Sequence, residues 1–302
     1  MKLILPVLAV VVALYGCTPP ARPPATATIP AAAGAIIHIV DATGATVVLP
    51  AVPHRIVSAA PSITETLYKL GVQNRLVLDT TSCRFPAAAA KKPHFNAMSA
   101  DVEPILAANP DLVICVAGED TRLLPGLLKA GVPVLQVKAS NLADVYQSIQ
   151  LIGSAVNAAQ AAIDLNQNIA TRIHIVEGKV SGLTRPSVLM VYSSNPIYTT
   201  GPKSFISDVV TAAGGHNAVS TEPVGDVLSS EQAIALHPQV IICDKDVAVQ
   251  LENLPGWRQS VPAVINHRFY SDDNLNRPGP SLAGACERLA AWLHPGHAGL
   301  SK

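Results

Sequence analysis

The sequence predicts an α/β fold of two lobes with mainly parallel sheets, joined by one long rigid helix. First, short and wholly apolar strands alternate with helices in both halves of the chain, which is typical of parallel sheets covered on both faces. Second, residues 142–176 lack proline and carry aliphatic side chains at mostly helical spacing. Third, residues 103–115 and 231–243 resemble each other, which indicates two similar lobes.

Composition and length allow this organisation. The chain has 302 residues, of which 49% are hydrophobic, enough to build two separate cores. We expect five segments: a signal peptide at 1–17, a flexible tether at 18–35, a first lobe at 36–139, a linking helix at 140–180 and a second lobe at 181–302.

In the first lobe, two β-rich runs flank turn residues and predict a hairpin. The expected strands are 36–40, 46–49, 55–58, 76–78, 111–116 and 132–137, and the expected helices begin near residues 62, 103 and 121. Ser62 is a suitable N-cap, and Glu65 three residues later completes a capping box. A long polar connection is expected from residue 79 to residue 101.

The middle and the second lobe follow the same rules. Residues 142–176 predict one helix of about 30 residues, which is about 45 Å long at 1.5 Å per residue and could run the length of two domains. After Gly182 the alternation resumes. The expected strands are 187–192, 240–243 and one beginning at 262–265, and the expected helices are 204–213, 231–236 and 281–293.

The N-terminus predicts export and a lipid anchor. Leu3 to Tyr15 is an apolar run broken only by Pro6, and it is too short to span a bilayer. The run ends at Gly16-Cys17, which resembles the lipobox of bacterial lipoproteins. We expect cleavage before Cys17, lipidation of its thiol, and attachment to a bacterial membrane in the periplasm or at the cell surface. The alternative is an ordinary cleaved signal peptide.

The two similar segments each begin with an acidic residue and end in an apolar strand. Glu103 and Glu231 occupy the same position in them, and both segments contain a proline before the strand. A glutamate in a first helical turn interacts favourably with the helix dipole, so local helix capping is one explanation of the repeat. The other explanation is a repeated functional point, one in each lobe.

Other classes of function find little support. The formal net charge is zero, so neither a nucleic-acid partner nor a polybasic membrane patch is expected, and we expect a monomer. No G-x-S-x-G, H-E-x-x-H or P-loop motif is present, so no enzyme activity is expected, with a secreted hydrolase as the alternative class. The cysteines show no metal-ligand spacing, and no metal site is expected. Cys83, Cys115, Cys243 and Cys286 are expected to be free thiols, one disulfide being the alternative.

Several motifs together resemble one known family, the periplasmic binding proteins that serve importers of cobalamin, ferric siderophores and haem. The motifs are Arg55–Glu65, 103–115, 231–243, Tyr198–Phe205, 212–217 and Arg277–Pro280. The resemblance implies a class III fold, a ligand cleft between the lobes, and one surface glutamate per lobe that pairs with arginines of the membrane permease. These glutamates match Glu103 and Glu231.

Within that family, Ser82–Pro86 most resembles the cobalamin-binding branch, and Asp273–Arg277 matches a second ligand loop. We therefore expect a transported corrinoid and no cofactor. The candidate cleft residues are Ser62, Ser82, Cys83, Arg84, Phe85, Tyr198, Lys203, Asp273, Asn274, Leu275, Asn276 and Arg277. A flat ligand favours aromatic partners; those available are Phe85, Phe95, Tyr192, Tyr198, Phe269 and Tyr270. A ferric siderophore would instead require clustered Arg or Lys, and haem would require an axial His or Tyr.

Overall fold

The computed structural model describes residues 36–119, 122–297 and 299–300. The expected signal peptide, the lipidation of Cys17 and the tether at 18–35 lie outside these residues. Gly34–Lys302 form one compact unit. Within the described ranges, no helix combines the length and the apolar character that a membrane span needs.

The first lobe is built on a five-stranded parallel sheet with the order β5-β4-β3-β6-β7. Its strands are β3 (Ile56–Ser58), β4 (Leu76–Thr80), β5 (His94–Phe95), β6 (Leu112–Val116) and β7 (Val134–Val137). The helices of this lobe are α1 (Pro61–Lys69), α2 (Glu103–Ala107), α3 (Leu124–Lys129) and α4 (Leu142–Ala155). The predicted hairpin is confirmed as antiparallel β1 (Ile37–Val40) and β2 (Thr46–Leu49). Every residue of β6 is buried, as expected for a strand covered on both faces.

The second lobe repeats this plan with a four-stranded parallel sheet of order β11-β8-β13-β14. Its strands are β8 (Ser187–Met190), β11 (His216–Asn217), β13 (Val240–Ile242) and β14 (Phe269–Tyr270), and β9 (Ser193–Ser194), β10 (Ile197–Tyr198) and β12 (Val227–Leu228) form a small antiparallel sheet beside it. Its helices are α6 (Phe205–Ala212), α7 (Ser230–Ala235), α8 (Lys245–Glu252), α9 (Trp257–Ser260), α10 (Pro262–Ile265) and α11 (Leu282–Leu293). The predicted two-lobed α/β fold with mainly parallel sheets is therefore confirmed.

The expected strand at 262–265 is wrong, because this segment is the short helix α10. Pro262 occupies the first helical turn, where the proline's missing N–H costs nothing, whereas in a sheet it would remove a ladder hydrogen bond. The strand begins later, at Phe269.

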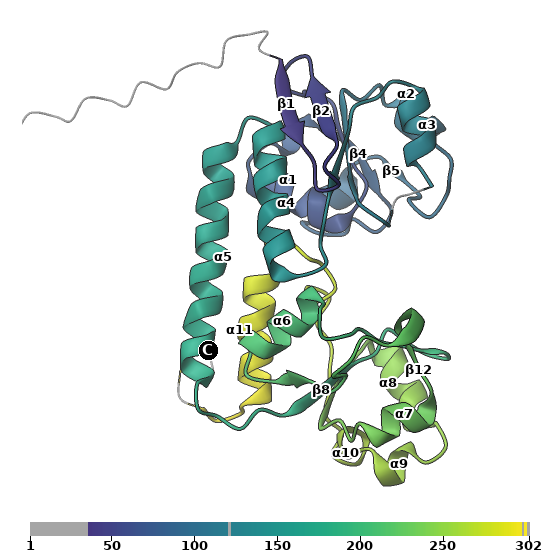
Figure 1. Cartoon of the computed structure of the whole chain (residues 1–302), viewed down its shortest axis with the longest axis vertical. Helices are drawn as coiled ribbons and strands as arrows, with labels where there is room; N and C mark the ends of the chain where they lie inside the picture. The colour runs from purple at the N-terminus through teal and green to yellow at the C-terminus, as the bar shows by residue number, and fades with distance from the viewer. Residues whose placement is uncertain (1–35, 120–121, 298, 301–302) are drawn as a thin grey trace, which may run out of the picture. The chain divides into compact units, whose positions relative to one another are not determined.

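The expected single helix over 142–176 is two helices, α4 and α5 (Ala159–Val180). The chain turns at Asn157, whose φ of 55° is left-handed and ends α4. A Cβ on Gly153 would lie 2.4 Å from the Cβ of Ala162, so this glycine permits the close approach of α4 and α5. Helix α4 packs on α1 and β7 of the first lobe and also contacts α6 of the second lobe. Helix α5 runs from the first lobe to the second, where it packs on α6 and α11 (Figure 1).

One apolar cluster joins the two lobes along α5. It contains Ile149 of α4, Ile173 of α5 and Leu289 of α11, all almost fully buried. Two smaller clusters lie within the individual lobes. A continuous core on the α5 side ties the lobes together there and leaves the opposite side to loops.

Candidate functional site

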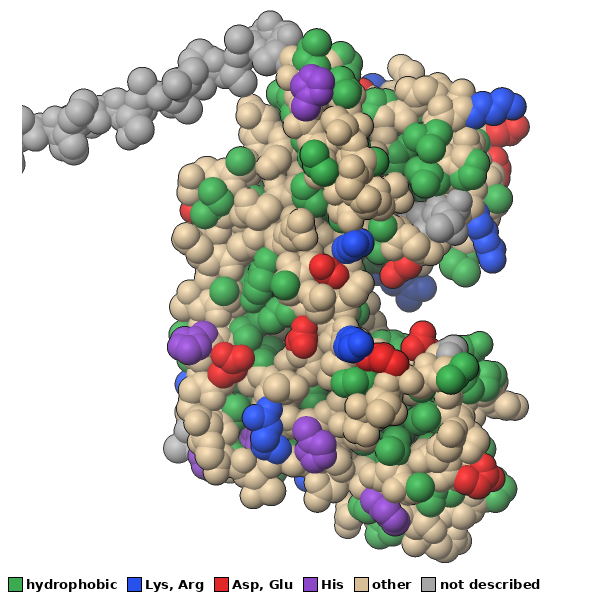
Figure 2. Space-filling view, in the orientation of Figure 1, with side chains coloured by type: hydrophobic (Ala, Val, Ile, Leu, Met, Phe, Trp, Pro, Cys, Tyr) green, Lys and Arg blue, Asp and Glu red, His purple; other side chains and the backbone are tan. Residues whose placement is uncertain are grey.

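Loops that follow the carboxyl ends of strands in both lobes meet between the lobes. Ligands of open α/β sheets bind at such strand ends. Figure 2 shows the surface hollowed between the lobes on the side away from α5. Two small cavities, both partly open to solvent, border this cleft, of about 10 Å³ in the first lobe and about 30 Å³ in the second. Each has room for only one or two water molecules, so a larger ligand would occupy the open cleft itself.

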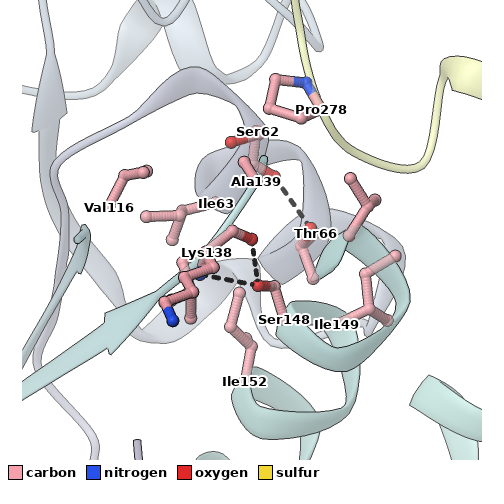
Figure 3. A pocket seen from close by; sticks show the side chains of 12 residues that line it. Ser62, Ile63, Thr66, Val116, Lys138, Ala139, Ser148, Ile149, Ile152 and Pro278 are labelled. Carbon is pink, nitrogen blue, oxygen red and sulfur yellow. Dashed lines mark hydrogen bonds between the residues drawn. The ribbon is translucent and has the colours of Figure 1, made fainter. Parts of the chain in front are cut away.

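The first-lobe cavity lies beside α1 and α4 (Figure 3). Ser62 and Pro278 lie at one end of it, although they are far apart in the sequence. Deeper in, the Ser148 hydroxyl donates to the Lys138 carbonyl at 2.5 Å and accepts from the Lys138 N–H at 3.1 Å. These bonds hold the chain in place where it leaves β7.

Residues 277–281 cross from the second lobe to α1 of the first. A Cβ on Gly279 would lie 3.3 Å from the Cβ of Ser62, so the crossing chain packs closely on the start of α1. The Ser281 hydroxyl then donates to a carboxylate oxygen of Glu65, whose side chain is fully buried. Burial raises the pKa of Glu65, and its second carboxylate oxygen has no partner among the described residues.

The capping box expected at Ser62 and Glu65 is therefore wrong. Helix α1 begins with Pro61 after Ala60, and no side chain caps it. Ser62 lies within the first turn, and its carbonyl accepts from the Thr66 hydroxyl at 2.8 Å. Glu65 points into the interior because its partner comes from the other lobe, 216 residues away in the sequence.

Two of the predicted ligand loops are brought together across the cleft. The guanidinium of Arg277 lies over the ring of Phe85, 5.1 Å from the ring centroid. Arg277 also donates to the side-chain oxygen of Asn274. Asp272 in turn accepts from both the backbone and the side-chain nitrogen of Asn274 at 3.0 Å.

Asp272 is held by Arg288 of α11 at 2.8 Å. Burial opposes the ionisation of Asp272, but the hydrogen bonds from Arg288 and Asn274 outweigh it and lower the pKa. A chain of polar contacts thus runs from α11 to the cleft.

Two of the predicted cleft residues are wrong. Leu275 is fully buried and belongs to the apolar cluster along α5, because the turn after Asp272 directs it inward. Cys83 is 1% exposed, and its sulfur lies 3.2 Å and 3.3 Å from the hydroxyls of Thr80 and Thr64. Both residues shape the loops from inside and cannot contact a ligand.

The other predicted cleft residues keep at least part of their surface. Ser82, Arg84, Lys203, Asp273 and Asn276 are exposed, and Asn274 is half-buried. Ser62 is largely buried beneath the crossing chain. All four described cysteines are buried, and Cys83, Cys243 and Cys286 are free thiols.

Three aromatic side chains at the cleft are partly exposed: Phe85 and Tyr192 on loops, and Tyr198 at the end of β10. Phe85 is 41% exposed, and Tyr192 and Tyr198 are each 44% exposed. The Tyr192 N–H donates to the Tyr198 carbonyl at 2.9 Å. Desolvation, with a contribution from Asp226, raises the pKa of Tyr192 to about 12.

The remaining aromatic candidates are structural. Phe95 and Phe269 pack in the lobe cores, and Tyr270 packs against Trp292, 5.2 Å between ring centroids. Tyr192, two residues after the end of β8, was the residue that strand-end reasoning could have selected.

Glu103 and Glu231 lie exposed in the first turns of α2 and α7. The similarity between residues 103–115 and 231–243 extends from the sequence to the structure. Asn109 and His237 end the two segments' helices with left-handed φ values of 46° and 45°. Matching backbone hydrogen bonds precede the next strands. The Asp111 N–H donates to the Arg55 carbonyl and the Gln239 N–H donates to the Ser187 carbonyl, both at 3.0 Å.

Helix capping explains only part of this pattern. The capping box of α7 is made by Ser229 and Gln232. Hydrogen bonds from its own N–H and from the Ser229 hydroxyl lower the pKa of Glu231, so it is ionised at neutral pH. The Glu103 N–H instead donates to the Asp101 side chain at 2.9 Å. Both carboxylates remain accessible to a partner.

A larger hollow of about 870 Å³ lies along α5 and α11. Its charged side chains already have partners. Arg172 pairs with Glu287 at 2.7 Å, Arg288 pairs with Asp272 at 2.8 Å, and Lys179 donates to the Gly299 carbonyl at 2.7 Å. It is lined by helix surfaces rather than by strand-end loops, so the cleft is the better candidate for ligand binding.

Comparisons with known proteins agree on the class. A model of the periplasmic binding protein family matches residues 56–275. The chain is 30% identical over 270 residues to an uncharacterised ABC transporter substrate-binding lipoprotein of Bacillus subtilis, covering 86% of each chain. It is 28% identical over 254 residues to a vitamin B12-binding protein of Pectobacterium carotovorum, covering 80% of this chain and 89% of that one. A periplasmic haem-binding protein of Roseiflexus, solved in apo form, is 25% identical with a TM-score of 0.69, covering 80% of this chain and 97% of that one.

Proposed function

This chain belongs to the periplasmic binding protein family, and from that premise we propose that it carries a corrinoid to the permease of an ABC importer. The fold is that of the class III members, as the sequence predicted. The observation that carries the proposal is the cleft, where loops from both lobes meet through Arg277 and Phe85. A related protein of Pectobacterium carotovorum is a vitamin B12-binding protein.

The chemistry of the cleft supports a large, flat ligand. A corrinoid presents a broad ring face and amide arms. Phe85, Tyr192 and Tyr198 offer partly exposed aromatic surface for the face. Exposed polar residues of both lobes, among them Ser82 and Asn276, offer partners for the amides.

Haem is the second candidate. The exposed phenol of Tyr198 is of the kind that ligates haem iron, and the apo structure from Roseiflexus belongs to a haem-binding protein. Haem would also present two carboxylates to the cations of the cleft.

Delivery would use Glu103 and Glu231 as docking points for arginines of the permease. Exposed single ion pairs contribute only about 0–1 kcal/mol each. Two pairs on one scaffold fix the orientation and raise the encounter rate. The core along α5 would keep their separation nearly constant. We further propose that a lipid on Cys17 holds the protein at the membrane, as the lipoprotein relative from Bacillus subtilis suggests.

Calorimetric titration of the full chain tests the ligand. We expect heat and one binding site with cyanocobalamin, and weaker or no binding with haemin and a ferric siderophore. If haemin is the only one of the three ligands that binds, haem becomes the proposed ligand in place of a corrinoid. Absence of heat with cyanocobalamin would reject the proposal.

A further inference from the structure

We propose that Arg277 forms an anion-binding subsite that recognises the phosphodiester of a complete corrinoid. The site would then distinguish cobalamin from its nucleotide-free precursor class, the cobinamides. This inference rests on the proposed corrinoid function and adds to it the part of the ligand that is recognised.

Arg277 lies between the two cavities that border the cleft. Asn276, the residue before it, lines the second-lobe cavity, and Pro278, the residue after it, lines the first-lobe cavity. The Arg277 side chain is half-buried and reaches Phe85 of the opposite lobe. Its guanidinium therefore lies where the two lobes approach each other.

The guanidinium is held before any ligand arrives. Phe85 supports one of its faces, and Asn274 accepts from Nη2. Asn274 is fixed by Asp272, which is itself fixed by Arg288. A side chain that is already ordered loses less conformational entropy on binding, so more of its interaction energy appears as affinity.

Arg277 keeps binding capacity in this arrangement. Across residues 36–119, 122–297 and 299–300, no ion pair includes Arg277, and its Nη1 makes no hydrogen bond. The buried carboxylate of Glu65 attracts Arg277, but Glu65 is fully enclosed and bonded to Ser281. Arg84, next to Phe85, adds a second exposed cation on the opposite lobe.

The chemistry of a guanidinium selects the ligand group. Its planar N–H groups match the geometry of phosphate and carboxylate oxygens and form strong charge-assisted bonds. The corrin ring of a cobinamide carries amide arms and lacks the nucleotide loop, whereas cobalamin carries one phosphodiester in that loop. Among corrinoids, the phosphodiester is therefore the anion that Arg277 would recognise.

The test compares cyanocobalamin with dicyanocobinamide by titration of the full chain. We expect wild type to bind cyanocobalamin more tightly, and Arg277→Gln to reduce that preference by about 10- to 100-fold, the range for one charge-assisted hydrogen bond. Arg277→Lys should lose part of the preference, because it keeps the charge but not the planar fork.

Arg268→Gln is the matched control. Arg268 also stacks on an aromatic ring, 5.0 Å from the Trp292 centroid, but it lies at the amino end of β14 and away from the cleft. It should leave the preference unchanged. The subsite alone would be overturned if Arg277→Gln weakened the binding of both corrinoids equally. It would also be overturned if Arg268→Gln reduced the preference as much as Arg277→Gln does. If wild type binds neither corrinoid, the proposed function fails together with this inference.

Discussion

Each lobe places one carboxylate against the start of a helix from the other lobe, and the two contacts differ in burial. Glu65 of α1 accepts from Ser281, the residue directly before α11. Asp208 of α6 accepts from the N–H of Leu142, the first residue of α4, at 2.9 Å. The first lobe supplies the carboxylate in one contact, and the second lobe supplies it in the other.

The electrostatics of the two contacts are nevertheless unequal. Asp208 is half-buried, and its partner is a helix-start N–H that needs an acceptor in any case. Glu65 is fully buried and accepts a hydrogen bond from the Ser281 hydroxyl. Its other carboxylate oxygen has no partner among the described residues. Related lobes therefore repeat backbone arrangements more closely than they repeat charge environments.

The largest expected effect concerns the feature that both lobes share, the exposed glutamates. Replacing Glu103 and Glu231 together by alanine should abolish ligand uptake in cells, because both docking pairs are lost. Ligand affinity measured by calorimetry should not change. Glu177→Ala, on the exposed surface of α5, is the control and should leave uptake intact. Normal uptake by the double variant would show that the repeat is only a folding feature.

The next effect tests whether the repeated units are equally well packed. Ile105 of α2 and Ala233 of α7 occupy equivalent positions, and both are fully buried. Ile105→Ala should destabilise by about 2–5 kcal/mol by leaving a cavity. Ala233→Ile should cost about 1–3 kcal/mol by overpacking. Denaturant unfolding measures both, and Ala235→Leu on the exposed side of α7 should stay within about 0.5 kcal/mol.

A smaller effect sharpens the contrast between Glu65 and Asp208. Burial raises the pKa of Glu65 above its ordinary value of 4.5, so the folded state binds more protons than the unfolded state. The contribution of Glu65 to the free energy of unfolding is fully present below about pH 4.5, and it is lost as the pH rises through the pKa of the folded state. Glu65→Gln should therefore flatten the fall of Tm with rising pH. Ser281→Ala should steepen it, because the Ser281 hydrogen bond favours the charged form. Parallel profiles for wild type and Glu65→Gln would contradict this account.

The smallest effect compares the left-handed residues that end α2 and α7. His237 tolerates its φ of 45° less well than Asn109 tolerates 46°, because asparagine favours this region. His237→Gly should stabilise by about 0.5–1 kcal/mol, and Asn109→Gly should be close to neutral. Thermal unfolding of the two variants side by side provides the measurement, and an equal gain at both positions would argue against the difference.

Local patterns predicted most of the elements. The merging of α4 and α5 shows their limit, because a hydrophobic pattern does not show where the chain turns. Buried strands such as β6 and β13 were predictable because an apolar run of this length is needed inside a parallel sheet. Helices α4 and α5 were merged, because their aliphatic spacing continues through the turn at Asn157. Gly153 was the signal: only its contact with Ala162 shows why it is a glycine.

The candidate site was predictable by loop but not by side chain. Ser82–Pro86 and Asp273–Arg277 do lie at strand ends, yet Cys83 and Leu275 point inward. A loop has no periodicity, so the sequence alone does not show which of its side chains face the solvent. For the same reason, Tyr192 was named only among the aromatic residues available to a flat ligand and not among the candidate cleft residues, although it is partly exposed.

The sequence by itself determined the two similar lobes, the buried strands and the exposed acidic helix starts, because each follows from local propensity and hydrophobic pattern. Tertiary structure alone decided that Glu65 meets Ser281 and that Arg277 stacks on Phe85. These partners are separated by 216 residues in the first case and by most of the chain in the second. Such contacts depend on how the lobes pack along α5, and no local pattern encodes that packing.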